Sequence, residues 1–168
     1  AFTPAGYTSF ERMCCGWLTP IVLTDETEVT DMEALSEGGD AYMLRNDAYP
    51  DEFYLLENRQ RTGWDAALYA NGMLILHVDY DEAVWYNNEV NTTYDTETGN
   101  DHQRCTIFHA DNMPNGTYKA PSPYLTNDSL TATSTPAATL YHENSEGTLL
   151  MTMAITHIRQ NLSGTMRF

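Results

Sequence analysis

Two short apolar runs lie close together between Asp51 and Asp81, and a polar loop joins them. The first run is FYLL at 53–56 and the second is MLIL at 73–76, and each leads directly into polar residues. Apolar runs of roughly four to eight residues bounded by Gly, Asn and Asp are typical of buried strands. Because an unpaired buried charge costs several kcal/mol, the polar ends of such strands must find partners inside the protein. The sequence therefore predicts a central pair of covered strands with internal polar networks.

The first of these strands continues through a polar tetrad, which consists of Glu57, Asn58, Arg59 and Gln60. Side chains alternate across a strand, so Glu57 and Arg59 are expected on one face and the two amides on the other. We predict that Glu57 and Arg59 share a polar network, with Arg45 of the preceding strand as a candidate member. Two interpretations are open: the network fixes the strand register, or it lines a substrate cleft.

The second strand ends in His77, Val78 and Asp79, which places an imidazole and a carboxylate on one face. Such a pair is compatible with a metal site, with a general base and its orienting group, or with a structural histidine. We favour the structural histidine, because a zinc site needs at least three protein ligands and no third ligand occurs at a defined spacing. Asp79 and Asp81 begin like a calcium loop, but the Gly and Glu of an EF-hand are missing.

Four segments carry a family resemblance: GYTSFERMCCGW at 6–17, LLENRQ at 55–60 with the following G-W-D loop, HVD at 77–79, and HQRCTIFHADN at 102–112. Together they resemble the secreted zinc metallopeptidases of the immune inhibitor A type, over most of residues 4–112. The resemblance implies a secreted protein that takes part in peptide-bond hydrolysis. In that family the zinc helix with its HExxH motif precedes the matching region, and no HExxH occurs in these 168 residues.

The resemblance therefore implies the downstream part of a catalytic region, inactive alone, with zinc ligands outside this chain. Its implied partners are the upstream catalytic segment of the same protein and a protein or peptide substrate. No catalytic residue carries over. Six positions carry over only as scaffolding or cleft wall, namely Glu57, Asn58, Arg59, Gln60, His77 and Asp79. The start at Ala1, without a Met or a signal region, leads us to expect a piece of a longer protein.

Two other functions stay open. An extracellular β-rich module that binds carbohydrate or protein is suggested by Trp64 and Trp85, which stand among acidic residues and can stack on a partner. A self-sufficient hydrolase built on the His77 and Asp79 pair ranks last, since no G-x-S-x-G or other nucleophile motif is present. The other histidines, His102, His109, His142 and His157, are assigned to structure or surface.

The charge disfavours nucleic acid as a partner. The formal net charge is −16 and the pI is near 4.3, whereas nucleic-acid binding depends on Lys and Arg. The acidity has two interpretations: it keeps the protein soluble, or it reflects an extracellular, calcium-rich environment in which carboxylates bind cations. Calcium is therefore a candidate ligand besides the zinc implied by the resemblance. No apolar run approaches the roughly 20 residues needed to cross a bilayer. Three cysteines are too few for a disulfide framework, and we expect packed thiols.

The N-terminal region predicts one short helix. Thr8 and Glu11 form a capping box, and apolar residues follow at helical spacing. The members of this stripe are Phe10, Met13, Cys14 and Trp17. A shorter helical turn is expected near 81–90.

The remaining pattern predicts a mainly β (α+β) fold, with an antiparallel sheet or sandwich of about seven strands. We expect one domain over 1–168: a helix at 1–17, a β-rich region at 18–112, a long loop at 113–138 with a short strand at 118–120, and terminal strands at 139–168. One or two short strands are expected between residues 20 and 37. Residues 151–158 and the last residues of the chain are expected to form a terminal hairpin.

Overall fold

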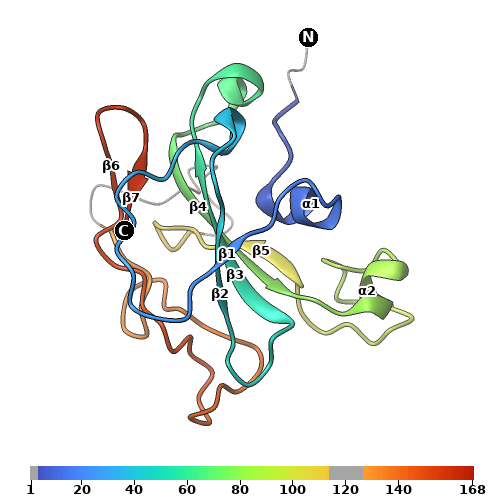
Figure 1. The fold of residues 1–168 in the computed structure, drawn as a ribbon. Coiled ribbons are helices and arrows are strands. Elements are labelled where there is room, and N and C mark those ends of the chain that lie inside the picture. Colours follow the sequence, from blue (N-terminus) through green and yellow to red (C-terminus); the bar gives the residue numbers. More distant parts are fainter. Residues whose placement is uncertain (1–3, 114–126) are drawn as a thin grey trace.

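A five-stranded mixed sheet forms the centre of the molecule in a computed structural model that describes residues 4–113 and 127–168 (Figure 1). Its spatial order is β1-β2-β3-β4-β5. The strands are β1 (Ile21–Val22), β2 (Tyr42–Arg45), β3 (Glu52–Arg59), β4 (Gly72–Asp79) and β5 (Cys105–Ile107). All neighbours pair antiparallel except β1, which runs parallel to β2. The predicted mainly β fold is confirmed.

The predicted central pair of strands is β3 and β4. They pair along their whole length, from Glu52 opposite Asp79 to Arg59 opposite Gly72, and every residue of both strands is buried. Both faces of this hairpin are covered, which explains why its apolar residues form continuous runs instead of alternating with polar ones. The preceding strand, β2, pairs antiparallel with β3.

The two faces of the hairpin belong to two hydrophobic clusters. Tyr54 and Leu56 of β3 pack with residues from the C-terminal part of the chain, including Leu130, Ile155 and Met166. The side chains on the opposite face pack with Phe10 of α1 (Ser9–Cys14). These side chains are Phe53, Leu55, Leu74, Leu76 and Val78. The sheet therefore lies between the C-terminal segments and the N-terminal helix, as Figure 1 shows.

The N-terminal helix begins at the predicted capping box. The Thr8 hydroxyl accepts from the Glu11 amide, and the Glu11 carboxylate accepts from the Thr8 amide at 2.7 Å. The predicted apolar stripe is only partly correct. Phe10 is buried and Met13 packs beside it, but Cys14 is exposed and Trp17 is 66% exposed. The helix ends before the stripe completes a second turn, so Trp17 packs on Tyr7 instead, with 5.7 Å between the ring centroids.

Replacing Thr8 by Ala is expected to lower the free energy of unfolding by about 1 kcal/mol, because the substitution removes the side-chain acceptor at the start of α1. Urea unfolding followed by circular dichroism measures this change. Thr24→Ala, in an exposed loop, is the matched control and should leave stability nearly unchanged. Equal effects of the two substitutions would contradict a capping role.

The peripheral elements are shorter than the sequence predicts. Between residues 20 and 37 the structure has β1, isolated bridges at Met32 and Ala34, and the 3₁₀ helix η1 (Leu35–Glu37). The terminal hairpin is β6 (Arg159–Gln160) with β7 (Met166–Arg167). Residues 151–158 make only a single bridge, from Ile155 to Leu130. A second helix, α2 (Glu82–Tyr86), occupies the predicted helical turn, and η2 (Gly63–Ala67) follows β3.

The predicted strand at 118–120 lies outside the described residues, as does most of the first half of the predicted 113–138 loop. Among the residues that the structure describes, no helix is long and apolar enough to cross a membrane. All three cysteines are free. The expectation of packed thiols is wrong for Cys14 and Cys15, which are exposed, while burial raises the pKa of Cys105 to about 11.

Candidate functional site

Polar side chains gather at both ends of the β3–β4 hairpin. The first group, which we call the clamp, consists of Glu57 and Arg59 at the end of β3 and Asp65 in η2, and all three are buried. Arg59 Nη1 lies 3.4 Å from Glu57 Oε1, and Arg59 Nη2 lies 3.1 Å from Asp65 Oδ1. The predicted network of Glu57 and Arg59 on one face is therefore present.

The clamp holds the backbone of residues 6–9. Arg59 donates to the Gly6 carbonyl at 2.8 Å and to the Tyr7 carbonyl at 3.1 Å. Asp65 Oδ1 accepts from the Gly6 amide at 2.8 Å, and Glu57 accepts from the amide of Ser9. Side chains of β3 and η2 thus fix the chain just before and at the start of α1.

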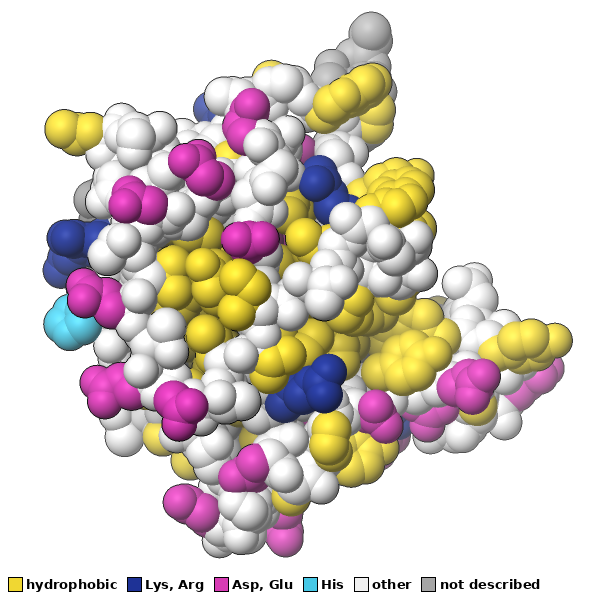
Figure 2. Space-filling view, in the orientation of Figure 1, with side chains coloured by type: hydrophobic (Ala, Val, Ile, Leu, Met, Phe, Trp, Pro, Cys, Tyr) yellow, Lys and Arg dark blue, Asp and Glu magenta, His cyan; other side chains and the backbone are white. Residues whose placement is uncertain are grey.

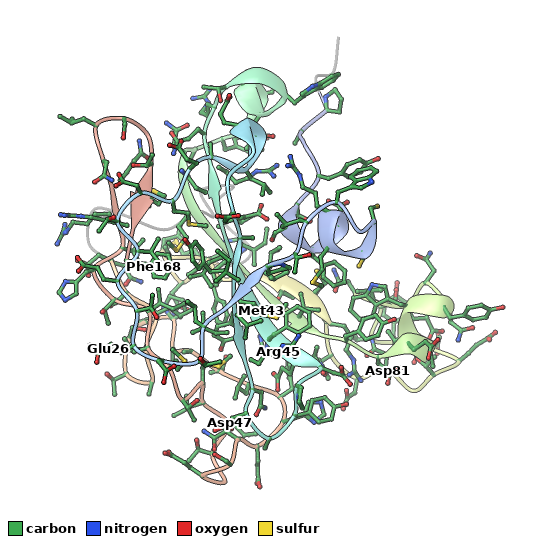
Figure 3. The ribbon with its side chains drawn as sticks, in the orientation of Figure 1. Glu26, Met43, Arg45, Asp47, Asp81 and Phe168 are labelled. Carbon is green, nitrogen blue, oxygen red and sulfur yellow. The ribbon has the colours of Figure 1, made fainter. Side chains whose placement is uncertain are left out.

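Arg45 does not belong to the clamp, so this part of the prediction is wrong. The register pairs Arg45 with Phe53, near the opposite end of β3, and its Nε lies 3.2 Å from Met43 Sδ. Figure 3 labels Arg45 beside Met43; Arg45 is the last residue of β2 and is exposed, whereas Met43 is buried. The antiparallel pairing separates Arg45 from Glu57 by most of the strand.

The two amide side chains of the tetrad, Asn58 and Gln60, make hydrogen bonds on the opposite face of β3. Asn58 donates to the carbonyls of Met32 and Gly164 at 2.8 and 2.9 Å, and Gln60 donates to Asn58 Oδ1 at 2.8 Å. Asn58 therefore joins the first third of the chain to the C-terminal hairpin. All four residues of the tetrad are used for internal contacts.

Burial raises the pKa of the Glu57 carboxyl, although Arg59 and the Ser9 amide act in the opposite direction. The unfolded carboxyl has a pKa near 4.5, so above that value the folded state holds more protons than the unfolded state. Stability contributed by this group is then lost as the pH rises through the folded pKa.

We therefore expect Glu57→Gln to gain stability relative to the wild type as the pH is raised from about 4.5 towards neutrality. Urea unfolding at a series of pH values measures the difference. Glu146→Gln, at an exposed carboxylate, is the control and should follow the wild type. Parallel curves for Glu57→Gln and the wild type would contradict the raised pKa.

The second group lies at the other end of the hairpin, where Glu52 and Asp79 are directly opposite each other and fully buried. Facing carboxylates repel each other unless donors neutralise them. Glu52 accepts from His77 Nε2 at 2.7 Å and from the amides of Tyr141 and His142 at 2.7 and 3.0 Å. Burial alone would raise the pKa of Glu52, but these hydrogen bonds together hold it below its usual value.

Asp79 is the centre of a separate set of contacts. Its Oδ2 lies 2.6 Å from Arg104 Nη1, 2.8 Å from His102 Nε2 and 3.2 Å from His142 Nε2. His77 and Asp79 share a face as predicted, but the partner of His77 is Glu52. Sequence patterns do not bring Glu52, His102, Arg104 and His142 together, because these residues come from three separate places in the chain.

Aromatic rings pack around this second group. His142 stacks on Tyr49 at 3.8 Å between ring centroids, and His102 stacks on Tyr141 at 3.7 Å. Together with the Glu52 contacts, these rings fasten residues 139–145 to the end of the sheet. The group thus performs the same task for the C-terminal segment that the clamp performs for the N-terminal one.

The polar group around Asp79 does not suit a bound cation. The described residues contain no arrangement of three or more His, Cys, Asp or Glu side chains that could hold a metal. The assembly of Asp79 with two imidazoles carries the guanidinium of Arg104 on the same carboxylate oxygen, and this positive charge opposes a bound cation.

His77 also lines a cleft of about 600 Å³ beside β5, together with Thr106 and Tyr141. A hydrolase that uses a histidine as base needs a nucleophile within hydrogen-bond reach of it. Within the described ranges, no Ser, Thr or Cys side chain makes a hydrogen bond to His77. The geometry here is that of an oriented histidine in a polar network.

The two candidate contact tryptophans lie apart. Trp64 is in η2, after the end of β3, and is 67% exposed. Trp85 is in α2, after the end of β4, and packs on Phe10 and Tyr80. Because β3 and β4 are antiparallel, these two sites are at opposite ends of the hairpin. They do not form one aromatic platform.

A comparison with protein-family models gives no match, and comparisons with curated proteins and with solved structures give none either.

Proposed function

We propose that this chain is the C-terminal portion of a secreted zinc-dependent metallopeptidase, in which it supports the catalytic part and does not hydrolyse peptide bonds alone. The observation that supports this proposal is the clamp. Three buried polar side chains, Glu57, Arg59 and Asp65, are committed to holding the backbone of residues 6–9. Residues 6–17 are the segment that, in the resembling family, follows the zinc-bearing part.

The chemistry of zinc peptidases determines which role the upstream segment and which role this chain has in the proposal. Hydrolysis needs a zinc ion with an open coordination position and a nearby general base. An HExxH helix supplies both in many such enzymes, and this sequence contains no HExxH. In the proposal the upstream segment supplies the metal and the base, and this chain positions that segment. The substrate is a protein or peptide outside the cell.

Zinc stoichiometry tests the proposal. The protein encoded by the whole gene and the chain of 168 residues are purified without chelator, and their zinc is measured by mass spectrometry. We expect about one zinc per molecule of the whole protein and none in the shorter chain. One tightly bound zinc in the shorter chain would contradict the proposal, and so would an encoded protein without an HExxH motif.

The exposure of Trp64 favours a second candidate function, an extracellular β-rich module that binds carbohydrate or protein. Asp65, the next residue, is buried and held by Arg59, so the position of Trp64 is fixed while its side chain faces solvent. An aromatic ring held in this way is suited to stacking on a sugar. Glycan-array binding that is lost in Trp64→Ala and retained in Tyr86→Ala would support this function, and an array without signal would count against it.

A further inference from the structure

A groove of about 770 Å³ lies between the loop at 23–29 and the segment at 153–159. Figure 2 shows hydrophobic side chains in this region of the molecule with carboxylates around them, and Figure 3 labels Glu26 and Phe168 there. The floor of the groove is apolar. It is formed by Leu23, Val29, Leu44, Met153, Ile155 and Phe168.

One wall of the groove is the short segment 154–156, which pairs with the other described residues only through the isolated bridge of Ile155 with Leu130 and is followed by His157 in the left-handed region (φ 58°). The backbone N–H and C=O of Ile155 both bond to Leu130, at 2.9 and 2.8 Å. At an antiparallel bridge, the residues on either side of the bonded one direct their backbone groups away from the partner. Ala154 and Thr156 are these neighbours; they are exposed, they line the groove, and they make no backbone hydrogen bond with any described residue. Such an edge can accept another strand.

The opposite wall is acidic. The loop contributes three exposed carboxylates, those of Asp25, Glu26 and Glu28. Two arginines also line the groove. The charge of Arg159 is partly neutralised by Asp128, which lies 3.0 Å away, so Arg167 is the main positive charge there. The wall formed by the loop therefore attracts basic side chains.

From these three features we infer that the groove binds an extended peptide in which basic and apolar residues alternate. The peptide adds as a strand alongside Ala154–Thr156, and its backbone bonds to the unpaired groups of those residues. Because side chains alternate along a strand, its apolar side chains reach the floor while the basic ones meet Asp25, Glu26 and Glu28. This site is independent of zinc and of the proposed peptidase function.

Fluorescence anisotropy tests the inference on the chain of 168 residues. The probe is a short fluorescein-labelled peptide of alternating Lys and Val, and the comparison is its Glu and Val counterpart. We expect the basic peptide to bind at least about tenfold more tightly. Equal binding of the two peptides, or no binding of either, would overturn the inference.

Two variants separate the backbone contribution from the charge contribution. Ala154→Pro removes one N–H from the open edge and leaves the Ile155 bonds to Leu130 in place, so it should weaken binding at least about tenfold. Glu26→Lys combined with Glu28→Lys should do the same, whereas Glu146→Lys, outside the groove, should not. Melting temperatures identify the variants that fold. A folded Ala154→Pro variant that binds like the wild type would overturn strand addition, as would self-association of the chain through this edge.

Discussion

Replacing Arg59 by Met is expected to lower the free energy of unfolding by about 3 kcal/mol. The substitution leaves Glu57 buried without its cation, and it removes the donor to the Gly6 and Tyr7 carbonyls. We place the cost at the lower end of the range for broken buried ion pairs, because Glu57 can take up a proton when Arg59 is absent.

Arg159→Met provides the matched control for this prediction. Arg159 also forms an ion pair, with Asp128, but both side chains are largely exposed, so the loss should be about 0 to 1 kcal/mol. Urea unfolding, followed by circular dichroism and tryptophan fluorescence, measures both variants. A double-mutant cycle with Glu57→Gln then isolates the coupling within the clamp. Similar costs for Arg59→Met and Arg159→Met would show that the clamp contributes no more than a surface pair.

Replacing Glu52 by Gln is also expected to cost about 3 kcal/mol. Glu52 is fully buried and accepts from His77, from two backbone amides and from Asn46. A glutamine side chain keeps one acceptor oxygen and turns an NH₂ group towards groups that also donate. The residues held by Glu52 should therefore open more often.

Hydrogen exchange locates this second effect. Exchange of the Tyr141 and His142 amides should become faster in Glu52→Gln, while exchange in the β3–β4 hairpin should follow global stability. Because the pKa of Glu52 is lowered in the folded state, its contribution is present above the unfolded pKa and is lost as the pH falls through the folded pKa. Glu143→Gln, on the same segment and exposed, is the control. Unchanged exchange at Tyr141 and His142 would exclude the fastening role.

The central hairpin could be predicted because its information is local. Apolar runs with polar ends identify β3 and β4, and the alternation of side chains places Glu57 and Arg59 together without knowledge of any other element. The capping box at Thr8 is local in the same sense. In each case the relevant residues are within a few positions of one another.

The second polar group could not be predicted because its members are distant in sequence. His77 pairs with Glu52, 25 positions away, and Asp79 with His142, 63 positions away. Single histidines in polar segments give no signal of a shared partner. In the C-terminal part, Ile155 belongs to the core and pairs with Leu130 through a single bridge. An isolated bridge requires no alternation of apolar and polar residues over several positions, so the sequence carries no strand pattern for it.

Hydrolysis of a protein substrate by the protein encoded by the whole gene tests the central claim most directly. Casein cleavage is measured for the whole protein, for the whole protein after removal of zinc by a chelator, and for the chain of 168 residues. The proposal predicts cleavage by the whole protein only, loss of cleavage with the chelator, and recovery when zinc is added back. Cleavage by the chain of 168 residues alone, or cleavage by the whole protein that is insensitive to zinc removal, would contradict it.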